Sequence, residues 1–213
     1  MPLSSLDIVF YYTWQATGPE NNTLSLGGTI SSYTIPDNLA NNVFDDVTGD
    51  ESELGDIEYR AIAVKNTSSS FDMLNTKVWI EDYNRASSGG DTIYFALENP
   101  SGSPSSIQLI EDESTSPDES KFVVKTGETV SWTVEGSPSS TLEFGTVGPG
   151  EWFGVWLKRE VPGGASAFSN RTVTIKVQCE TTASPHRYPV IKEYSITWMG
   201  NRFYVVRDIQ ESV

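Results

Sequence analysis

The sequence predicts an all-β protein, a β-sandwich of the immunoglobulin-like or jelly-roll type. Runs in which side chains alternate recur from end to end, and short clusters of Gly, Pro, Asn and Ser separate them. Aromatic residues are abundant, with nine Phe, nine Tyr and six Trp, and such residues favour strands over helices. A chain of 213 residues is long enough to bury a core without disulfide bridges.

The clearest strand pattern lies in Val147–Val177. Two runs, Glu151–Lys158 and Arg171–Cys179, alternate strictly, and Pro162-Gly163-Gly164 between them must turn the chain. Such alternation predicts two strands that each bury one face and expose the other. In the first run the faces consist of Phe153, Val155 and Leu157 on one side and Trp152, Gly154 and Trp156 on the other.

The chain before this segment contains further strand-like runs and one helical pattern. The helix is predicted over Asp37–Thr48, where apolar residues recur at helical spacing and Asp37 can cap the N-terminus. Glu58–Asn66 is apolar on both faces, which predicts a central strand. We expect Thr76–Asp82 to pair with Thr92–Leu97. The other predicted strands are Asp7–Gln15, Leu24–Ile35 with a bend or bulge at Gly27-Gly28, Ser105–Glu111, Val130–Val134 and Leu142–Phe144.

The polar run Glu111–Ser120 predicts an exposed, mobile loop. The domain prediction is a sandwich over residues 1–183 and a C-terminal β-hairpin over residues 184–213. In that hairpin, Val190–Trp198 and Arg202–Arg207 are joined through Met199-Gly200-Asn201. Two interpretations stay open: these are the last strands of the sandwich, or they form an arm that contacts a neighbouring subunit.

The net charge of −15 argues against a nucleic-acid-binding groove and against an anionic membrane surface, because both require an excess of Lys and Arg. The first ten residues carry no basic region and no long apolar stretch, so we expect neither a signal peptide nor a transmembrane segment. Cys179 is the single cysteine, so an intramolecular disulfide is impossible. It falls on the apolar side of its strand, which predicts a small core residue and not a nucleophile.

Candidate catalytic residues are few, and we expect no enzymatic activity. His186 is the only histidine and sits in a proline-rich stretch, and no HExxH, CxxC or GxSxG motif occurs. Glu151 and Glu160 flank the tryptophan-bearing strand, and a glycosidase needs two carboxylates about 5–10 Å apart. Nothing in the sequence selects this pair over the many other acids.

No cofactor is expected, and calcium is the one weak candidate, because two acidic stretches offer several oxygen ligands. Neither stretch has the ligand spacing of an EF-hand loop, so a solvated acidic loop is the preferred interpretation. The two sets are Asp45, Asp46, Asp50, Glu51 and Glu53, and Glu111, Asp112, Glu113, Asp118 and Glu119.

Four residues of one strand are candidate contacts. Trp152 and Trp156 share a face, with Gly154 between them, which suits a stacking platform for a sugar, a core wedge or a subunit interface. Lys158 and Arg159 follow directly. Together with Arg60 they are basic residues in an acidic chain. They either pair with neighbouring acids on a wet surface or fix the corners of the sandwich and meet an acidic neighbour.

Several sequence segments, taken in their order along the chain, resemble virion-associated structural proteins of tailed phages and related prokaryotic viruses. The segments are SLGGTISSYTIP (Ser25–Pro36), NVFDDVTGDESELGDIEYRAIAVKNTSSS (Asn42–Ser70), the TKVWI run, and VGPGEWFGVWLKREVPGGASA (Val147–Ala167). The resemblance covers roughly residues 25–178, and the chain departs from the pattern after Cys179. It implies a component of the virion and no active site.

The leading hypothesis is therefore a non-enzymatic structural component of a tailed-virus virion, either a capsid decoration or a neck or tail protein. It would be made in the host cytoplasm, contact other virion proteins and form a homo-oligomer through many-copy contacts. The C-terminal hairpin or the N-terminal strand would add to a neighbour's sheet. The alternative is a carbohydrate-binding β-sandwich module that uses Trp152 and Trp156.

Overall fold

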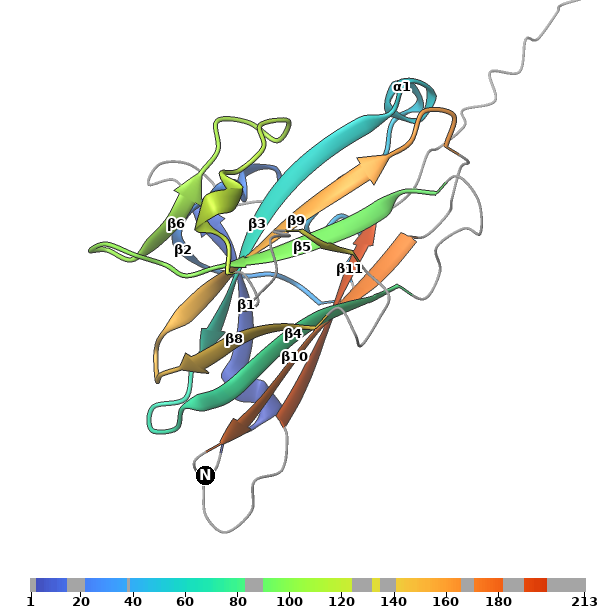
Figure 1. The fold of residues 1–213 in the computed structure, drawn as a ribbon. Coiled ribbons are helices and arrows are strands. Elements are labelled where there is room, and N and C mark those ends of the chain that lie inside the picture. Colours follow the sequence, from blue (N-terminus) through green and yellow to red (C-terminus); the bar gives the residue numbers. More distant parts are fainter. Residues whose placement is uncertain are drawn as a thin grey trace, which may run out of the picture.

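The computed structural model describes residues 3–14, 22–37, 39–82, 90–123, 132–134, 141–165, 171–181 and 190–198. These residues form two antiparallel sheets, as Figure 1 shows. The seven-stranded sheet has the order β6-β2-β1-β3-β9-β5-β7, and the four-stranded sheet has the order β11-β10-β4-β8. The prediction of an all-β sandwich is confirmed.

The seven-stranded sheet contains β1 (Ile8–Trp14), β2 (Gly27–Thr34), β3 (Asp56–Asn66), β5 (Thr92–Glu98), β6 (Ser106–Leu109), β7 (Thr133–Val134) and β9 (Trp152–Val161). The four-stranded sheet contains β4 (Met73–Asp82), β8 (Leu142–Val147), β10 (Arg171–Thr181) and β11 (Val190–Trp198). The helical elements are α1 (Gly49–Leu54) and the 3₁₀ turns η1 (Ser5–Asp7), η2 (Asn22–Leu24) and η3 (Glu119–Lys121).

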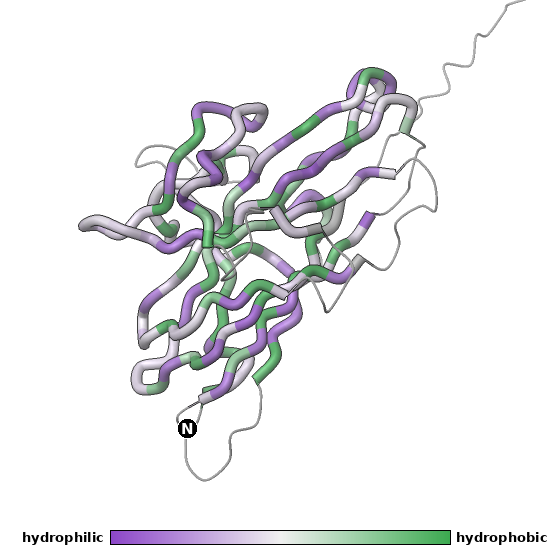
Figure 2. Tube along the Cα trace, viewed as in Figure 1, coloured by the Kyte–Doolittle hydropathy of each residue, from purple (hydrophilic) through white to green (hydrophobic). Residues whose placement is uncertain are grey.

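The main core lies between the two sheets. Apolar residues of β3, β5 and β9 face apolar residues of β4, β10 and β11, and all are nearly or fully buried. Figure 2 shows the alternation of apolar and polar residues along the paired strands that this packing requires. Cys179 is buried in this core, as predicted, and its burial raises the pKa of its thiol to about 11.

A second apolar cluster covers the outer face of the seven-stranded sheet. Trp152 and Trp156 of β9 pack there with Ile107 of β6. A Cβ added at Gly154 would lie 2.8 Å from the Ile107 side chain, so only glycine allows this approach. The prediction that β9 exposes one face is therefore wrong, because the chain folds β6 and its flanking loops back over that face.

The predicted helix over Asp37–Thr48 is also wrong. Val43, Phe44 and Val47 of that segment are buried in the main core and Leu39 is exposed, and the described residues adopt no helix. The helix begins after this segment, at Gly49, because Thr48 caps α1 and Glu51 accepts a hydrogen bond from the Thr48 backbone N–H. The capping residues Thr48 and Glu51, and not the helical spacing of the apolar residues before them, determine where the helix begins.

Strand pairing differs from the prediction in two places. β4 and β5 do not pair, since β5 lies beside β9 and β7, and β4 lies beside β10 and β8 in the other sheet. β1 is hydrogen-bonded on both sides, to β2 and β3, so the N-terminal strand is not free to add to a neighbour's sheet. The central position predicted for β3 is confirmed, because it lies between β1 and β9.

The C-terminal strand β11 pairs with β10 along nine residue pairs and forms an edge of the four-stranded sheet. The second predicted hairpin strand, Arg202–Arg207, and the histidine at position 186 lie outside the described residues. Glu111–Ser120 has no strand, as predicted, but it is tied to the sandwich: Tyr59 N–H donates to the Glu113 carbonyl at 2.7 Å.

Candidate functional site

The two tryptophans of the predicted site lie inside the protein. Trp156 is 0% exposed, and its indole N–H donates to a Glu98 carboxylate oxygen at 2.7 Å. The same carboxylate accepts from the backbone and side chain of Gln108. Trp152 is 8% exposed. The prediction of an open two-tryptophan platform is contradicted by this burial, and of the interpretations left open, the core wedge describes Trp156.

Lys158 lies in a row of side chains that crosses three strands of the outer face. It pairs across the sheet with Tyr59 on β3 and Tyr94 on β5. Its Nζ lies 3.9 Å from the centroid of the Tyr94 ring and 3.6 Å from a carboxylate oxygen of Glu160. The side chain is 17% exposed, so this cation is mostly enclosed by its neighbours.

Arg159 points to the other side of β9, into the main core, and is 0% exposed. Its guanidinium pairs with the Glu58 carboxylate, donates to the Asp45 carbonyl at 2.7 Å, and lies 4.9 Å from the centroid of the Phe44 ring. Glu58 and Arg159 are cross-strand partners on β3 and β9, which brings the two charges together.

Arg60 completes this group, which we call the corner cluster: Phe44, Asp45, Glu58, Arg60, Glu113 and Arg159. Arg60 is also fully buried, pairs with Glu113, and lies 5.9 Å from the Phe44 ring centroid. The cluster joins β3 and β9 to the segment before α1 and to the 110–120 loop. The burial of Arg60 and Arg159 contradicts the interpretation that they pair with acids on a wet surface, although Glu113 itself is 46% exposed. That they fix the corners of the sandwich or meet an acidic neighbour stays a prediction.

Burial raises the pKa of Glu58 from 4.5 to about 7, against the opposing influence of Arg159 and Arg60. The side chain is 3% exposed, so desolvation of the carboxylate dominates. Glu58 therefore titrates near neutrality while it is held among permanent cations.

Glu58 also belongs to a group of three acids. One carboxylate oxygen each from Glu51, Asp56 and Glu58 lies within 4.8 Å of the others. Two of them already have protein partners, since Glu51 accepts from Thr48 N–H at 2.7 Å and Glu58 binds Arg159. Helix capping and ion pairing account for this group.

Neither predicted calcium set assembles in full. Of the first set, only Glu51 belongs to the acidic group found among the described residues, and no member of the second set does. Asp112 and Asp118 instead accept hydrogen bonds from Ser and Thr side chains in their own turns, which lowers the pKa of both carboxyls.

A third buried arginine escaped sequence reasoning. Arg171 of β10 is 1% exposed, and its Nε donates to Asp91 Oδ1 at 2.6 Å. Asp91 directly precedes β5, so this pair links the two sheets. The only signal in the sequence was an arginine at the start of an apolar strand, and its partner stands eighty residues earlier.

The carboxylate pair considered for hydrolysis is not brought together. Glu151 precedes β9 and Glu160 lies near its other end, so about nine residues at about 3.3 Å each put them on the order of 30 Å apart. A pair acting on one glycosidic bond needs about 5–10 Å.

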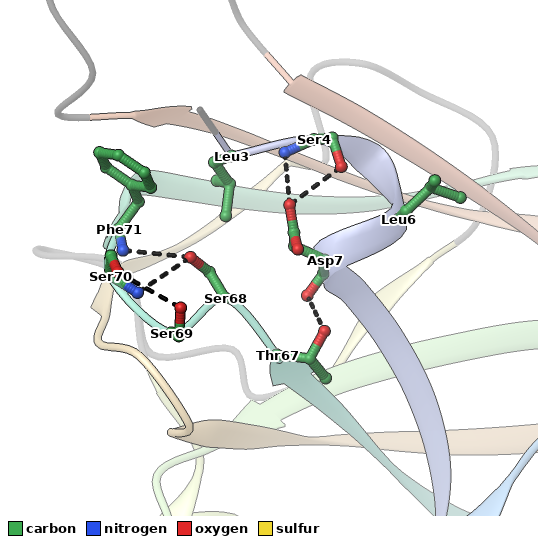
Figure 3. Close-up of a pocket in the computed structure, with 9 residues that line it drawn as sticks. All are labelled: Leu3, Ser4, Leu6, Asp7, Thr67, Ser68, Ser69, Ser70 and Phe71. Atoms are coloured by element: carbon green, nitrogen blue, oxygen red, sulfur yellow. Dashed lines mark hydrogen bonds between the residues drawn. The ribbon is translucent and has the colours of Figure 1, made fainter. Parts of the chain in front are cut away.

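The hollows on the described surface include one of about 650 Å³ and one of about 290 Å³. The larger lies between η1 and the 67–71 turn, and Figure 3 shows its lining. Its polar groups are bonded to one another: Asp7 accepts from the Ser4 backbone and hydroxyl, and Ser68 Oγ accepts from Phe71 N–H at 3.1 Å. We call it the N-terminal groove.

The smaller hollow, about 290 Å³, lies between the β8–β9 turn and the loop that follows β5. We call it the turn pocket. Its lining includes the aromatic side chains Phe144 and Trp152 and the polar side chains Asn99, Ser105, Thr146 and Glu151. Trp152, one of the two tryptophans predicted to form a platform, thus borders the turn pocket.

In the part of the chain that the structure describes, no helix combines the length and hydropathy needed to cross a bilayer.

No family model matches the chain, and no curated protein matches it. Among solved structures it is similar to the N-terminal domain of PorA, with 11% identity over 91% of this chain and 96% of that one and a TM-score of 0.35. It is also similar to the ASH/PapD-like domain 7 of human CEP192, with 11% identity, coverage of 73% and 80%, and a TM-score of 0.30. A third is CfaE, the adhesive subunit of the CFA/I fimbria of enterotoxigenic Escherichia coli, with 12% identity, coverage of 74% and 46%, and a TM-score of 0.32. Likeness at this level supports neither a family nor an activity.

Proposed function

We propose that this protein is a non-enzymatic structural component of a tailed-virus virion, a capsid decoration or a neck or tail protein that acts through many-copy protein contacts. The observation that carries the proposal is that three of the sequence segments with the virion-protein resemblance contact one another at or beside the corner cluster. Asn42–Ser70 supplies most of the corner cluster, and Val147–Ala167 supplies Arg159. Ser25–Pro36 contributes Ser25, whose carbonyl accepts from Ala61 N–H at 2.7 Å beside them.

The segments that resemble virion proteins include the residues of the corner cluster that join β3 and β9 to the segment before α1. Buried charges that hold strand ends together are costly to bury and strongly destabilising when one partner is lost. A scaffold that must present the same surfaces in many copies gains a single defined geometry from such pairs. The resemblance and the use of the buried charges therefore support the same kind of function.

The test is whether the protein is part of the particle. Virions purified through a density gradient should contain the chain at a constant ratio to the major capsid protein, measured by quantitative mass spectrometry. The protein should stay with the particles after a high-salt wash removes loosely bound host proteins. Presence only in the lysate of infected cells, and never on particles, would end this proposal.

A second test addresses the many-copy contacts. Light scattering coupled to size-exclusion chromatography should give a mass above that of one chain, or binding to empty capsids or tails should saturate at a multiple of the particle's symmetry. A chain that stays monomeric and binds neither capsids nor tails would contradict the proposed role.

A further inference from the structure

We propose that the turn pocket binds one residue of a neutral sugar. This would be a second property of the protein, independent of a place in the virion, because it depends only on the geometry between the β8–β9 turn and the loop after β5. In the described part of the chain, several of the pocket's polar side chains have no protein partner.

The pocket's size sets the first limit on its ligand. Its volume of about 290 Å³ is close to the lower end of small-molecule sites, which start at roughly 300 Å³. A single sugar ring or a similarly small molecule fits this space, and a nucleotide or an extended peptide does not. The pocket opens to solvent between two chain segments, so a terminal residue of a longer glycan can enter.

The lining combines the two kinds of group that recognise sugars. The half-buried Phe144 and the 8% of Trp152 that is exposed supply apolar surface at its wall, and Phe144 stacks on Phe153 with ring centroids 4.5 Å apart. Aromatic surface suits the C–H face of a pyranose ring, and surrounding polar groups bind its hydroxyls.

The polar groups are available. The side chains of Asn99, Ser105 and Thr146 are exposed to solvent and, within the described residues, make no hydrogen bond with the protein. One oxygen of Glu151 accepts from Gly148 N–H at 2.7 Å, which fixes the carboxylate. An amide, two hydroxyls and a carboxylate offer both donors and acceptors, as a polyol requires. The N-terminal groove differs, because its polar groups bind one another (Figure 3).

Charge selects against acidic sugars. Among the described residues that line the pocket, Glu151 is the only acidic or basic one, and the whole chain carries a net charge of −15. A carboxylate or sulfate on the ligand would meet a like charge at the pocket and a repulsive field around it. A neutral hexose or N-acetylhexosamine meets neither.

The experiment is an NMR titration of the ¹⁵N-labelled full chain with neutral probes at millimolar concentrations. The probes are methyl α-glucoside, methyl α-mannoside, methyl β-galactoside and N-acetylglucosamine. At least one should shift the Trp152 indole N–H and backbone amides of the β8–β9 turn saturably. Glucuronate should bind more weakly than methyl glucoside.

The variants Asn99→Ala and Thr146→Val each remove one polar group of the lining and should weaken binding about three- to tenfold, the effect of one lost hydrogen bond. Ser69→Ala in the N-terminal groove is the matched control and should leave binding unchanged. Circular dichroism and thermal unfolding confirm that all three variants fold.

The proposal is overturned if none of the four neutral probes gives saturable shifts, if the shifts map away from the turn pocket, or if both pocket variants bind like the wild type. Binding of glucuronate as tight as that of methyl glucoside would also overturn the assignment to neutral sugars. Failure here leaves the virion test untouched, because that test measures the protein on particles and not its ligand.

Discussion

Two sets of ion pairs in this protein use the same chemical groups in opposite surroundings. The arginines at positions 60, 159 and 171 are almost completely buried, and each pairs with a carboxylate between or beside the sheets. On the outer face of the four-stranded sheet, Lys176 pairs with Glu81 at 2.9 Å and with Glu193 at 3.1 Å. The three side chains are 15%, 25% and 62% exposed, so this set, the exposed set, keeps contact with solvent mainly through its carboxylates.

The difference teaches that burial, and not the presence of a pair, determines what an ion pair does. A solvent-exposed pair is screened and contributes roughly 0–1 kcal/mol. A buried pair contributes little net stability compared with a well-packed apolar pair, but removal of one partner leaves a charge without water or counter-charge. The buried set therefore specifies the geometry of the sandwich, whereas the exposed set tolerates change.

The largest effect is expected from Asp91→Ala. This change leaves the Arg171 guanidinium buried and still protonated, so the free energy of unfolding should fall by about 3–5 kcal/mol. Urea unfolding followed by tryptophan fluorescence measures it. The double variant Asp91→Leu with Arg171→Met should recover most of the loss. A single variant that costs less than about 1 kcal/mol would show that burial does not separate the two sets.

A smaller effect, visible as pH dependence, is expected from Glu58. Its pKa is raised from 4.5 to about 7, so the folded chain keeps a proton that the unfolded chain has released. The free energy of unfolding should fall as pH rises through this window, by at most about 3 kcal/mol from this group. Glu58→Gln should remove that slope and keep the low-pH stability at pH 8.

The matched control for this prediction is Glu160→Gln, which neutralises a half-exposed glutamate on the same sheet. Its unfolding curves should keep the wild-type pH slope between 4.5 and 7. An unchanged slope in Glu58→Gln would assign the pH dependence to other groups.

An intermediate case lies between the two sets. Lys158→Met keeps the apolar stem but removes the ammonium that lies over the Tyr94 ring and near Glu160. Because this cation lies 3.9 Å from the centroid of an aromatic ring as well as near a carboxylate, the expected loss is about 1 kcal/mol. Thermal unfolding of Lys158→Met and of Lys158→Arg separates the charge from the stem. A loss above about 3 kcal/mol would place Lys158 with the buried set.

The smallest effect is expected from Lys176→Met, which breaks both pairs of the exposed set. The free energy of unfolding should change by less than about 1 kcal/mol, and the difference from wild type should shrink as salt is added. The measurement is urea unfolding at low and high salt. A loss as large as that of Asp91→Ala would remove the distinction between the sets.

Much of the strand pattern could be predicted because it depends on neighbouring residues. The two apolar faces of Glu58–Asn66 predicted a central strand, and β3 is one. The glycines at 27 and 28 predicted a bulge. Gly27 adopts a φ of 98°, and the pairing of β2 with β6 shifts register there. Side-chain alternation and glycine conformations are local properties, so the sequence displays them.

The candidate sites were predicted less well because they depend on distant segments. Trp152 and Trp156 look identical in the sequence, and only the position of Ile107 and Glu98 decides that Trp156 is enclosed. Of the four predicted contact residues, Trp152 borders a cavity and Lys158 is partly exposed, while Trp156 and Arg159 are interior.

The order of residues by itself decided that this chain forms strands, that it turns at its glycine and proline clusters, and that its cysteine lies on an apolar face. Tertiary structure alone decided which strands are neighbours, which arginines are buried away from solvent, and which polar side chains line the turn pocket. The physical reason is the range over which each effect acts. Backbone preference acts over a few residues, whereas desolvation and pairing depend on segments far apart in the chain, such as Asp45 and Arg159, which are 114 residues apart.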